Sequence, residues 1–328
     1  TDTGVNLLSP GKTPTKNLQF LSFFSAVIDA VYQHHYLLMA GISNLSNSYR
    51  LGGNEAPPAV MSVFAGSTLS NIFKAIENMQ DLPVEEAGLE SIKIVNSIPE
   101  IFPDNTDRNR TSPFAFTGNR FEFRAVGSSI NVASAIYILN CAVAESLRRF
   151  RSEVDALTDK GVEKSKAIMD VIRQFTVESK DIMFEGNGYS KEWEEESRRR
   201  GLRAVLNVPD AYDVYHEEKT LGLFSGTGVL NREEVEARYE VLNETYVKKL
   251  QIEARVIGDI CLNHVLPAAV KYQNILIENV KGVKEIFGEE YKELCQSEFS
   301  TLKKISSLIN SITRDVEALV EARKKANR

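Results

Sequence analysis

Residues 114–124 read FAFTGNRFEFR, and this stretch decides what kind of fold the chain can adopt. Aromatic residues flank a Thr-Gly-Asn triplet, the pattern of two short strands joined by a tight turn. Alternate residues of a strand share one face of its sheet. We therefore expect the phenylalanines of the second strand to face the core, while Arg120, Glu122 and Arg124 line the opposite face.

Two interpretations of this row of charges remain open from the residues alone. The first is a solvated ion ladder on an outer sheet face. The second is a phosphate and metal site, because guanidinium groups suit phosphoryl oxygens and a carboxylate between them can hold a divalent ion. A further arginine pair in residues 108–112, RNRTS, precedes the hairpin and strengthens the second interpretation.

The rest of the first 130 residues is turn-rich, with eight of the ten prolines. Thr13 and Pro14 predict the cap and first turn of an amphipathic helix that ends near Gly41. We expect a second helix over residues 58–77 and a surface insertion over residues 78–107.

A glycine-containing loop between these two helices, residues 47–58, reads NSYRLGGNEAPP. It places Arg50 and Glu55 on either side of paired glycines. Loops of this kind can close over a substrate. An ordinary connection between helices is the alternative, because acids and prolines are favoured at helix starts anyway.

Residues 131–328 hold 63 of the 84 charged residues and read as long helices. Apolar residues recur every three or four positions over 136–157, and Gly161 is expected to interrupt that helix. Ser190 predicts the cap of a short helix. Asn231 and Glu234 form a capping-box pattern for a long helix that bends at Pro267. Residues 302–319 have the spacing of a seam against a partner helix, in this chain or another subunit. We place a domain boundary near residue 130, with domains 1–130 and 131–328.

Charge and hydropathy exclude several classes of protein. A net charge of −6 argues against binding to nucleic acid. No apolar run is long enough to span a membrane, and residues 1–4 lack the features of a signal peptide, so we expect a cytoplasmic protein. Three widely spaced cysteines predict buried thiols without disulfides or zinc. We expect packing roles for Trp193 and for the histidines, which are His34, His35, His216 and His264.

Several of these strings, in this order, resemble the C-terminal part of a type III glutamine synthetase. The resemblance covers essentially the whole chain and is most specific in residues 107–114 and 119–129. The matching strings are NLQFL at 17–21, RLGGNEAPP at 50–58, DRNRTSPF at 107–114, NRFEFRAVGSS at 119–129 and LNVPDAY at 206–212. It implies an α+β fold: part of an antiparallel-sheet catalytic domain, then a mainly α-helical C-terminal region of long packed helices.

The resemblance also implies an activity, namely that of a ligase of nitrogen metabolism. Such enzymes join ammonia to L-glutamate with ATP, through γ-glutamyl phosphate, and require Mg²⁺ or Mn²⁺. By resemblance, Arg50 holds glutamate, and Glu55 shields the acyl phosphate and takes a proton from ammonium. Arg124 contacts the transferring phosphate or the glutamate.

The nucleotide side of the site follows from the same resemblance. Arg110 and Arg120 correspond to arginines on the ATP phosphates, with Arg110 counted among the catalytic residues, and Glu122 corresponds to a metal-ligating glutamate. The assembly implied is a homo-oligomeric ring, a dodecamer in the complete enzyme, with no nucleic-acid or membrane partner.

The resemblance further implies that the other metal ligands and the N-terminal sheet domain precede Thr1. We therefore expect the 328 residues to be a piece of a longer protein and to be inactive alone. Two alternatives remain at this point. One is a phosphotransferase similar to guanidino kinases, and the other is a helical oligomerisation module without chemistry.

Overall fold

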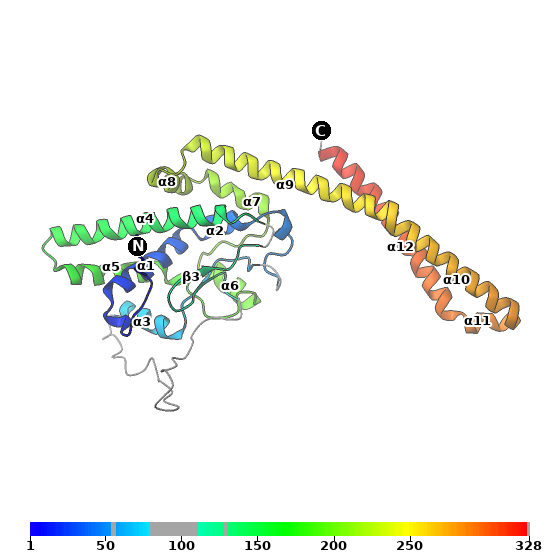
Figure 1. The fold of residues 1–328 in the computed structure, drawn as a ribbon, viewed down its shortest axis with the longest axis horizontal. Helices are drawn as coiled ribbons and strands as arrows, with labels where there is room; N and C mark the ends of the chain where they lie inside the picture. The colour runs from blue at the N-terminus through cyan, green and yellow to red at the C-terminus, as the bar shows by residue number, and fades with distance from the viewer. Residues whose placement is uncertain (54–56, 79–110, 128–129, 327–328) are drawn as a thin grey trace, which may run out of the picture. The chain divides into compact units, whose positions relative to one another are not determined.

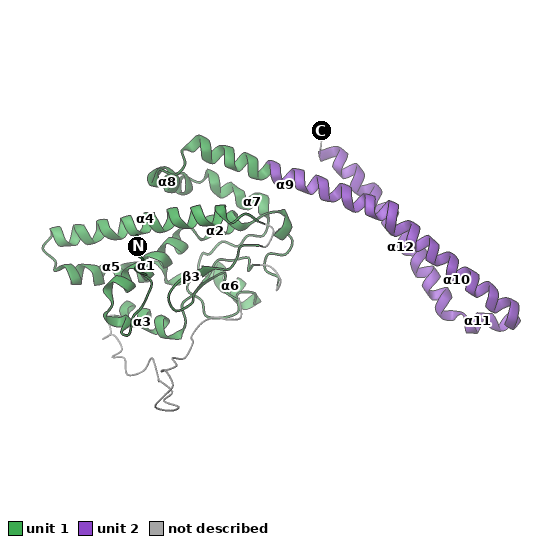
Figure 2. Cartoon of the chain, viewed as in Figure 1, with its two compact units in different colours: residues 1–243 green, residues 244–328 purple. Residues whose placement is uncertain are grey.

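The computed structural model describes residues 1–53, 57–78, 111–127 and 130–326. The chain forms two compact units, residues 1–243 and residues 244–328 (Figure 2). Helix α9 belongs to both units. The division that we place at residue 130 rests on composition and family resemblance, and it stays a prediction.

Unit 1 is mostly helical with a small sheet (Figure 1). Its elements, in chain order, are η1 Pro14–Lys16, α1 Leu18–Gln33, α2 His35–Ile42, η2 Leu45–Asn47, β1 Val63–Phe64, α3 Ser67–Glu77, β2 Phe114–Phe116, β3 Phe121–Phe123, α4 Ala133–Asp159, α5 Lys164–Ser179, η3 Lys180–Ile182, α6 Lys191–Arg199, α7 Val208–Tyr212, η4 Asp213–His216, α8 Glu218–Thr227 and the first half of α9 Arg232–Ile260. None of the helices in the described residues is long and apolar enough to cross a membrane.

The sheet has the strand order β1-β2-β3 and is mixed. Strands β2 and β3 are antiparallel, as the sequence predicts, with Ala115 opposite Glu122. Strand β1 pairs with β2 in parallel, with Val63 opposite Phe114. The expectation of an antiparallel sheet is therefore wrong for this pair. The reason is the connection, which runs through α3 and about 35 further residues and so is a crossover and not a hairpin.

The helix predicted over residues 58–77 begins only at Ser67. The preceding residues are extended because β2 offers a pairing edge and two consecutive prolines favour extended backbone. Gly66, with a φ of 82°, then turns the chain into α3. The insertion predicted over 78–107 lies, apart from residue 78, outside the described residues.

The first long helix begins later than predicted, at Leu18, and its cap is Asn17 instead of Thr13. The Asn17 side chain accepts a hydrogen bond from the Phe20 amide at 3.0 Å, whereas Thr13 and Pro14 begin a separate 3₁₀ turn. The chain breaks again at His34 before α2. The apolar spacing therefore covers two helices instead of one.

Helix α4 confirms the long helix predicted after residue 133, and Gly161, with a φ of 84°, follows its end. It packs against α1, α2, α5 and α8. The buried stripe differs from the predicted one: Ile138, Cys141 and Ser146 are buried, whereas Ile136 is 53% exposed. A Cβ on Gly41 would lie 2.5 Å from the Ile138 side chain, so the approach of α2 to α4 depends on a glycine at that position.

Two predicted caps are confirmed. The Ser190 hydroxyl accepts from the Trp193 amide at 3.2 Å at the start of α6. At the start of α9, the Asn231 side chain accepts from the Glu234 amide, and the Glu234 carboxylate accepts from the Asn231 amide, both at 2.8 Å. Each cap satisfies backbone donors that a helix end leaves unpaired.

Unit 2 is a helical hairpin. It contains the second half of α9, the π-helical turn Cys261–Val265 (η5), α10 Leu266–Phe287, η6 Gly288–Glu290, α11 Tyr291–Leu294 and α12 Gln296–Ala326. The irregular turn stands directly before Pro267, the position of the predicted bend, because proline cannot donate to the residue four before it.

The seam predicted over residues 302–319 packs within the chain. Arg323 bonds to Gln251 at 3.1 Å, and Gln273 bonds to Ser306 at 2.8 Å, so α12 runs antiparallel to α9 and α10. Between these contacts, Val316 is buried close to Gly258. The partner of the seam is therefore a helix of the same polypeptide.

The three thiols are free. Cys141 and Cys295 are buried, as predicted, but Cys261 is partly exposed because it lies in the π-helical turn of the hairpin. Trp193 is buried and stacks on Phe184 with ring centroids 3.9 Å apart, which confirms its packing role.

Candidate active site on strand β3

The β2–β3 hairpin carries the candidate site (Figure 1). Its turn closes with a hydrogen bond from the Thr117 amide to the Arg120 carbonyl at 2.8 Å. Gly118 adopts a φ of 93°, which a side chain at that position would disfavour. At the turn, the Asn6 side chain donates to the Asn119 carbonyl at 2.8 Å, so the N-terminal segment lies against this end of the hairpin.

The lower face of the hairpin is aromatic, as predicted. Phe121 stacks on Phe114 at 5.1 Å and packs on Phe24 of α1 at 5.0 Å. Phe123 contacts the same Phe114 ring at 5.9 Å. Phe24 also stacks on Phe73 of α3 at 5.0 Å. Packing on two helices holds the strand in place, and so the charged side chains on its other face have a rigid support.

The upper face of β3 brings Arg120, Glu122 and Arg124 together. Arg120 donates to Oε1 of Glu122 from Nε at 3.3 Å and from Nη2 at 3.2 Å, and Arg124 Nε donates to Oε2 at 3.2 Å. Exposure falls along the row: the side chains are 69% exposed for Arg120, 36% for Glu122 and 15% for Arg124. The acid is thus held between two cations with one side open to solvent.

Partial desolvation raises the pKa of the Glu122 carboxyl, but hydrogen bonds from Arg124 and Arg120 outweigh it and hold the pKa below its usual range. The group is therefore a carboxylate at neutral pH. A carboxylate with lone pairs still open can accept a metal ion as one ligand among several. In the described part of the chain, no cluster of three or more metal-binding side chains occurs, so Glu122 would be one ligand of a site that other residues complete.

Two of the other predicted residues, Glu55 and Arg110, lie outside the described residues. Arg50 is exposed in the turn that follows η2. The loop after it closes with a hydrogen bond from the Gly52 amide to the Pro57 carbonyl at 2.8 Å, and Gly52 has a φ of 84°. The structure thus places Arg50 at one base of the predicted glycine loop, and its role as a glutamate ligand stays a prediction.

A buried polar network that the sequence did not indicate joins α1, α4 and α5. The Asp29 side chain is 2% exposed and accepts from Arg149 Nη2 at 2.9 Å and from the Ser146 hydroxyl at 2.7 Å. Arg149 also bonds to Glu178 at 2.9 Å and covers the Phe175 ring at 4.1 Å. Burial raises the pKa of Asp29 against the opposing effect of its hydrogen bonds and Arg149. The only local signal was an aspartate on an apolar helix face.

This network lines a cavity of about 620 Å³ that also contains His34 and Glu145. His34 is buried, and its Nε2 lies 2.7 Å from Glu145 Oε2. His35 Nδ1 lies 2.7 Å from the Tyr32 carbonyl, and its Nε2 accepts from the Arg203 amide at 3.2 Å. Both histidines therefore have structural partners, in agreement with the predicted packing role.

The His34–Glu145 pair gives a pH prediction. The hydrogen bond from His34 lowers the pKa of Glu145, so the stability it contributes is present above the unfolded-state pKa of about 4.3 and is lost as pH falls through the lower folded value. We expect Glu145→Gln to be less stable than wild type by less than about 1 kcal/mol at pH 7, with the difference vanishing towards pH 3. Urea unfolding between pH 3 and 7 measures this.

The control is Glu240→Gln, which changes an exposed glutamate of α9. It should leave the urea midpoint within error of wild type at every pH. If the Glu145→Gln difference were the same at pH 3 and pH 7, the carboxylate would not be its source.

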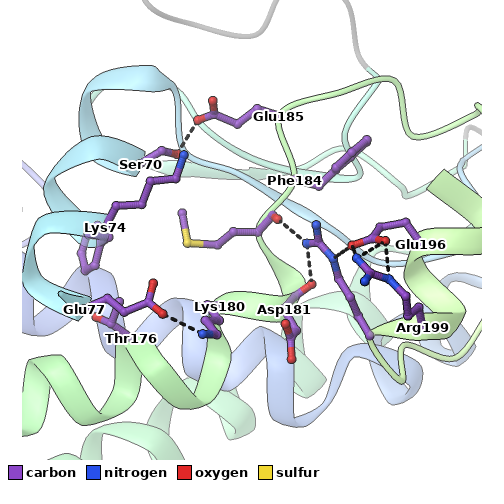
Figure 3. A pocket seen from close by; sticks show the side chains of 13 residues that line it. Ser70, Lys74, Glu77, Thr176, Lys180, Asp181, Phe184, Glu185, Glu196 and Arg199 are labelled. Atoms are coloured by element: carbon purple, nitrogen blue, oxygen red, sulfur yellow. Dashed lines mark hydrogen bonds and ion pairs between the residues drawn. The ribbon is translucent and has the colours of Figure 1, made fainter. Parts of the chain in front are cut away.

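A second hollow, of about 640 Å³, lies between α3, α5, η3 and α6 (Figure 3). Its charges are mostly paired: Lys180 bonds to Glu77 at 2.6 Å, and Arg199 bonds to Glu196 at 2.6 Å. Glu185 accepts a hydrogen bond from the Ser70 hydroxyl. Because most of its charged groups already have partners, this hollow offers few open contacts to a charged ligand, and β3 remains the better candidate site.

Comparison with known proteins gives the family. Residues 167–284 match the sequence profile described as "Glutamine synthetase C-terminal domain". The chain carries the C-terminal domain of the glutamine synthetase family. The match to this domain runs from α5 to α10, so it lies outside strand β3.

Relatives of this glutamine synthetase domain match over the whole chain, including β3. It is 45% identical over 332 residues to a "Glutamine synthetase" of Bacteroides fragilis (strain YCH46), covering 100% of this chain and 45% of that protein. It is 38% identical to a "Type-3 glutamine synthetase" of Dictyostelium discoideum, covering 99% of this chain and 43% of that protein. A "Glutamine synthetase" of Butyrivibrio fibrisolvens is 34% identical, with shares of 99% and 45%. The chain thus spans less than half the length of these relatives, and the recognised family resemblance is confirmed.

Proposed function

We propose that this chain forms the C-terminal part of an enzyme that joins ammonia to L-glutamate with ATP, through γ-glutamyl phosphate. The observation that carries the proposal is the β3 row, in which one carboxylate stands between two guanidinium groups on a strand buried from below. Relatives called glutamine synthetase that align over this strand support it.

The arginines have the chemistry that phosphoryl transfer to a carboxylate needs, which is positioning and charge neutralisation. We assign Arg120, whose side chain is 69% exposed, to the ATP phosphates together with Arg110. Arg124 is mostly buried, so its position is better defined, and we assign it to the transferring phosphate or to glutamate. Arg50 is assigned to the glutamate carboxylate.

Glu122 is assigned as one ligand of a divalent ion, Mg²⁺ or Mn²⁺, whose remaining ligands would come from outside the described residues. When bound, such an ion neutralises phosphoryl charge. What the chain itself does at this point is hold the carboxylate ionised and oriented, through Arg120 and Arg124.

Glu55 is assigned to a loop that shields the acyl phosphate from water and accepts a proton from ammonium. The described ends of that loop are joined by the Gly52–Pro57 hydrogen bond, which brings them together at a fixed base. Exclusion of water matters here because an acyl phosphate hydrolyses readily.

The proposal extends to a cytoplasmic homo-oligomer, a dodecameric ring in the complete enzyme, as the family resemblance implies. Its reaction partners would be glutamate, ammonia and ATP.

The proposal predicts where activity resides. The complete gene product that contains these residues should form glutamine from glutamate, ammonia and ATP with Mg²⁺ or Mn²⁺, whereas the purified 328 residues should not, because one carboxylate cannot hold a catalytic ion. Glutamine formation and ADP release measure this, with creatine and arginine as acceptors in parallel to test guanidino phosphotransfer. Phosphate transfer to a guanidino acceptor, or glutamine made by the 328 residues alone, would contradict the proposal.

A further inference from the structure

Residues 183–205 connect η3 to α7 and make backbone contacts with three separate parts of the first half of the chain. The Phe184 amide donates to the Val63 carbonyl at 3.0 Å, and the Gly188 amide donates to Thr111 at 3.2 Å. At the other end, the Val205 amide donates to Ala59 at 2.8 Å. We call residues 183–205 the bracket segment.

Each contact lies beside an element of the candidate site. Ala59 follows the loop that closes between Gly52 and Pro57. Val63 is the first residue of β1, next to β2. Thr111 directly follows Arg110, the arginine proposed for the ATP phosphates, in the chain. The bracket segment therefore ties together backbone from which the glycine loop, the sheet and a nucleotide arginine extend.

Gly188 makes the closest of these approaches. A Cβ at this position would lie 2.3 Å from the Thr111 carbonyl oxygen and 3.3 Å from Cγ of Pro58. The neighbour is main chain, which cannot rotate away as a flexible side chain can. A side chain at residue 188 would therefore have to displace either the bracket segment or Thr111.

Arg200 holds the beginning of the bracket segment from below. Its Nη1 donates to the carbonyls of Asp181 at 3.2 Å and Met183 at 3.0 Å, and its Nε donates to Glu196 at 2.7 Å. The neighbouring Arg199 bonds to Glu196 and is 77% exposed (Figure 3). Two adjacent arginines thus share one acid, but only Arg200 bonds to the backbone that enters the bracket segment.

We propose that Gly188 and Arg200 are positioning residues for nucleotide binding, because the bracket segment fixes the backbone of Thr111 and with it the point from which Arg110 extends. The inference rests on the proposed function and adds to it the part that residues of the C-terminal family domain take in the site. Neither residue touches substrate, and both act through Thr111.

The test compares matched pairs of variants in the complete gene product. Gly188→Ala is expected to raise the KM for ATP about tenfold and to leave the KM for glutamate within about twofold. Its control is Gly222→Ala on α8, where a Cβ would meet nothing within 4 Å. Arg200→Met should raise the KM for ATP about threefold, and Arg199→Met should leave it unchanged.

The split between the two KM values separates positioning from a general loss of folded enzyme. A lower kcat with both KM values unchanged, or equal increases in both, would overturn the inference. If Gly188→Ala does not fold, as fluorescence of Trp193, the single tryptophan, would show, the Arg200→Met and Arg199→Met pair decides.

A measurement without catalysis distinguishes this inference from the proposed function. Amide hydrogen exchange of residues 111–116 should be faster in Gly188→Ala than in Gly222→Ala. If the wild-type enzyme makes no glutamine, the proposed function fails, and exchange alone decides whether the bracket segment holds Thr111. Equal exchange in the two variants would overturn the bracket whatever the activity.

Discussion

A Glu122→Gln substitution in the complete gene product is expected to lower kcat for glutamine formation by roughly 10³-fold, because a lost metal ligand removes several kcal/mol of charge stabilisation. Glutamine keeps the shape of the side chain and can still accept from Arg120 and Arg124, so the strand should fold as before. What it loses is the negative charge that those two arginines keep ionised. Steady-state kinetics over a range of Mg²⁺ and Mn²⁺ concentrations measures the effect.

Glu195→Gln is the control, because Glu195 is an exposed glutamate of α6 in the same unit. It should retain wild-type kcat and metal dependence. If Glu122→Gln kept more than one-tenth of the activity at saturating metal, the row on β3 would be the solvated ion ladder of the ordinary interpretation, and the metal assignment would be wrong.

An Arg149→Met substitution is expected to lower the free energy of unfolding by about 3 kcal/mol at pH 7, because it leaves the buried Asp29 carboxylate without its cation. Methionine keeps part of the packing on Phe175, so the loss should come mainly from charge. The raised pKa of Asp29 sets the sign with pH: the folded state holds its proton more tightly, and stability therefore falls as pH rises through the folded pKa. The variant should accordingly lose less stability at pH 5 than at pH 7.

Urea unfolding of three variants measures this effect. Asp29→Asn combined with Arg149→Met should recover most of the loss, since removing both partners leaves no buried charge. Arg151→Met changes an arginine of the same helix that is 84% exposed, and it should cost less than about 1 kcal/mol. Additive losses in the double variant, or a loss that does not depend on pH, would show that the ion pair is not the source.

Features that depend on near neighbours could be predicted. The hairpin of residues 114–124, the Asn231 capping box and the spacing of residues 302–319 each involve residues a few positions apart, and all three were confirmed. The geometry of Glu122 between two arginines follows from the two-residue period of a strand, so it too was predictable.

Features that depend on a distant partner were predicted wrongly or missed. Residues 63–64 read as helix but form β1, because β2, about 50 residues later, offers a pairing edge. The buried face of α4 differs from its most apolar stripe because α1, α2, α5 and α8 surround it. The Asp29–Arg149 pair was missed because its two members lie 120 residues apart.

The amino-acid order by itself determined the strand that presents Glu122 and the family to which the domain belongs, because short-range spacing sets both the alternation of a strand and the motifs that relatives share. Only the tertiary structure decided that residues 183–205 hold the backbone at Ala59, Val63 and Thr111. Those contacts are hydrogen bonds between main-chain atoms, which every residue except proline can form as a donor, so no side-chain pattern marks them in advance.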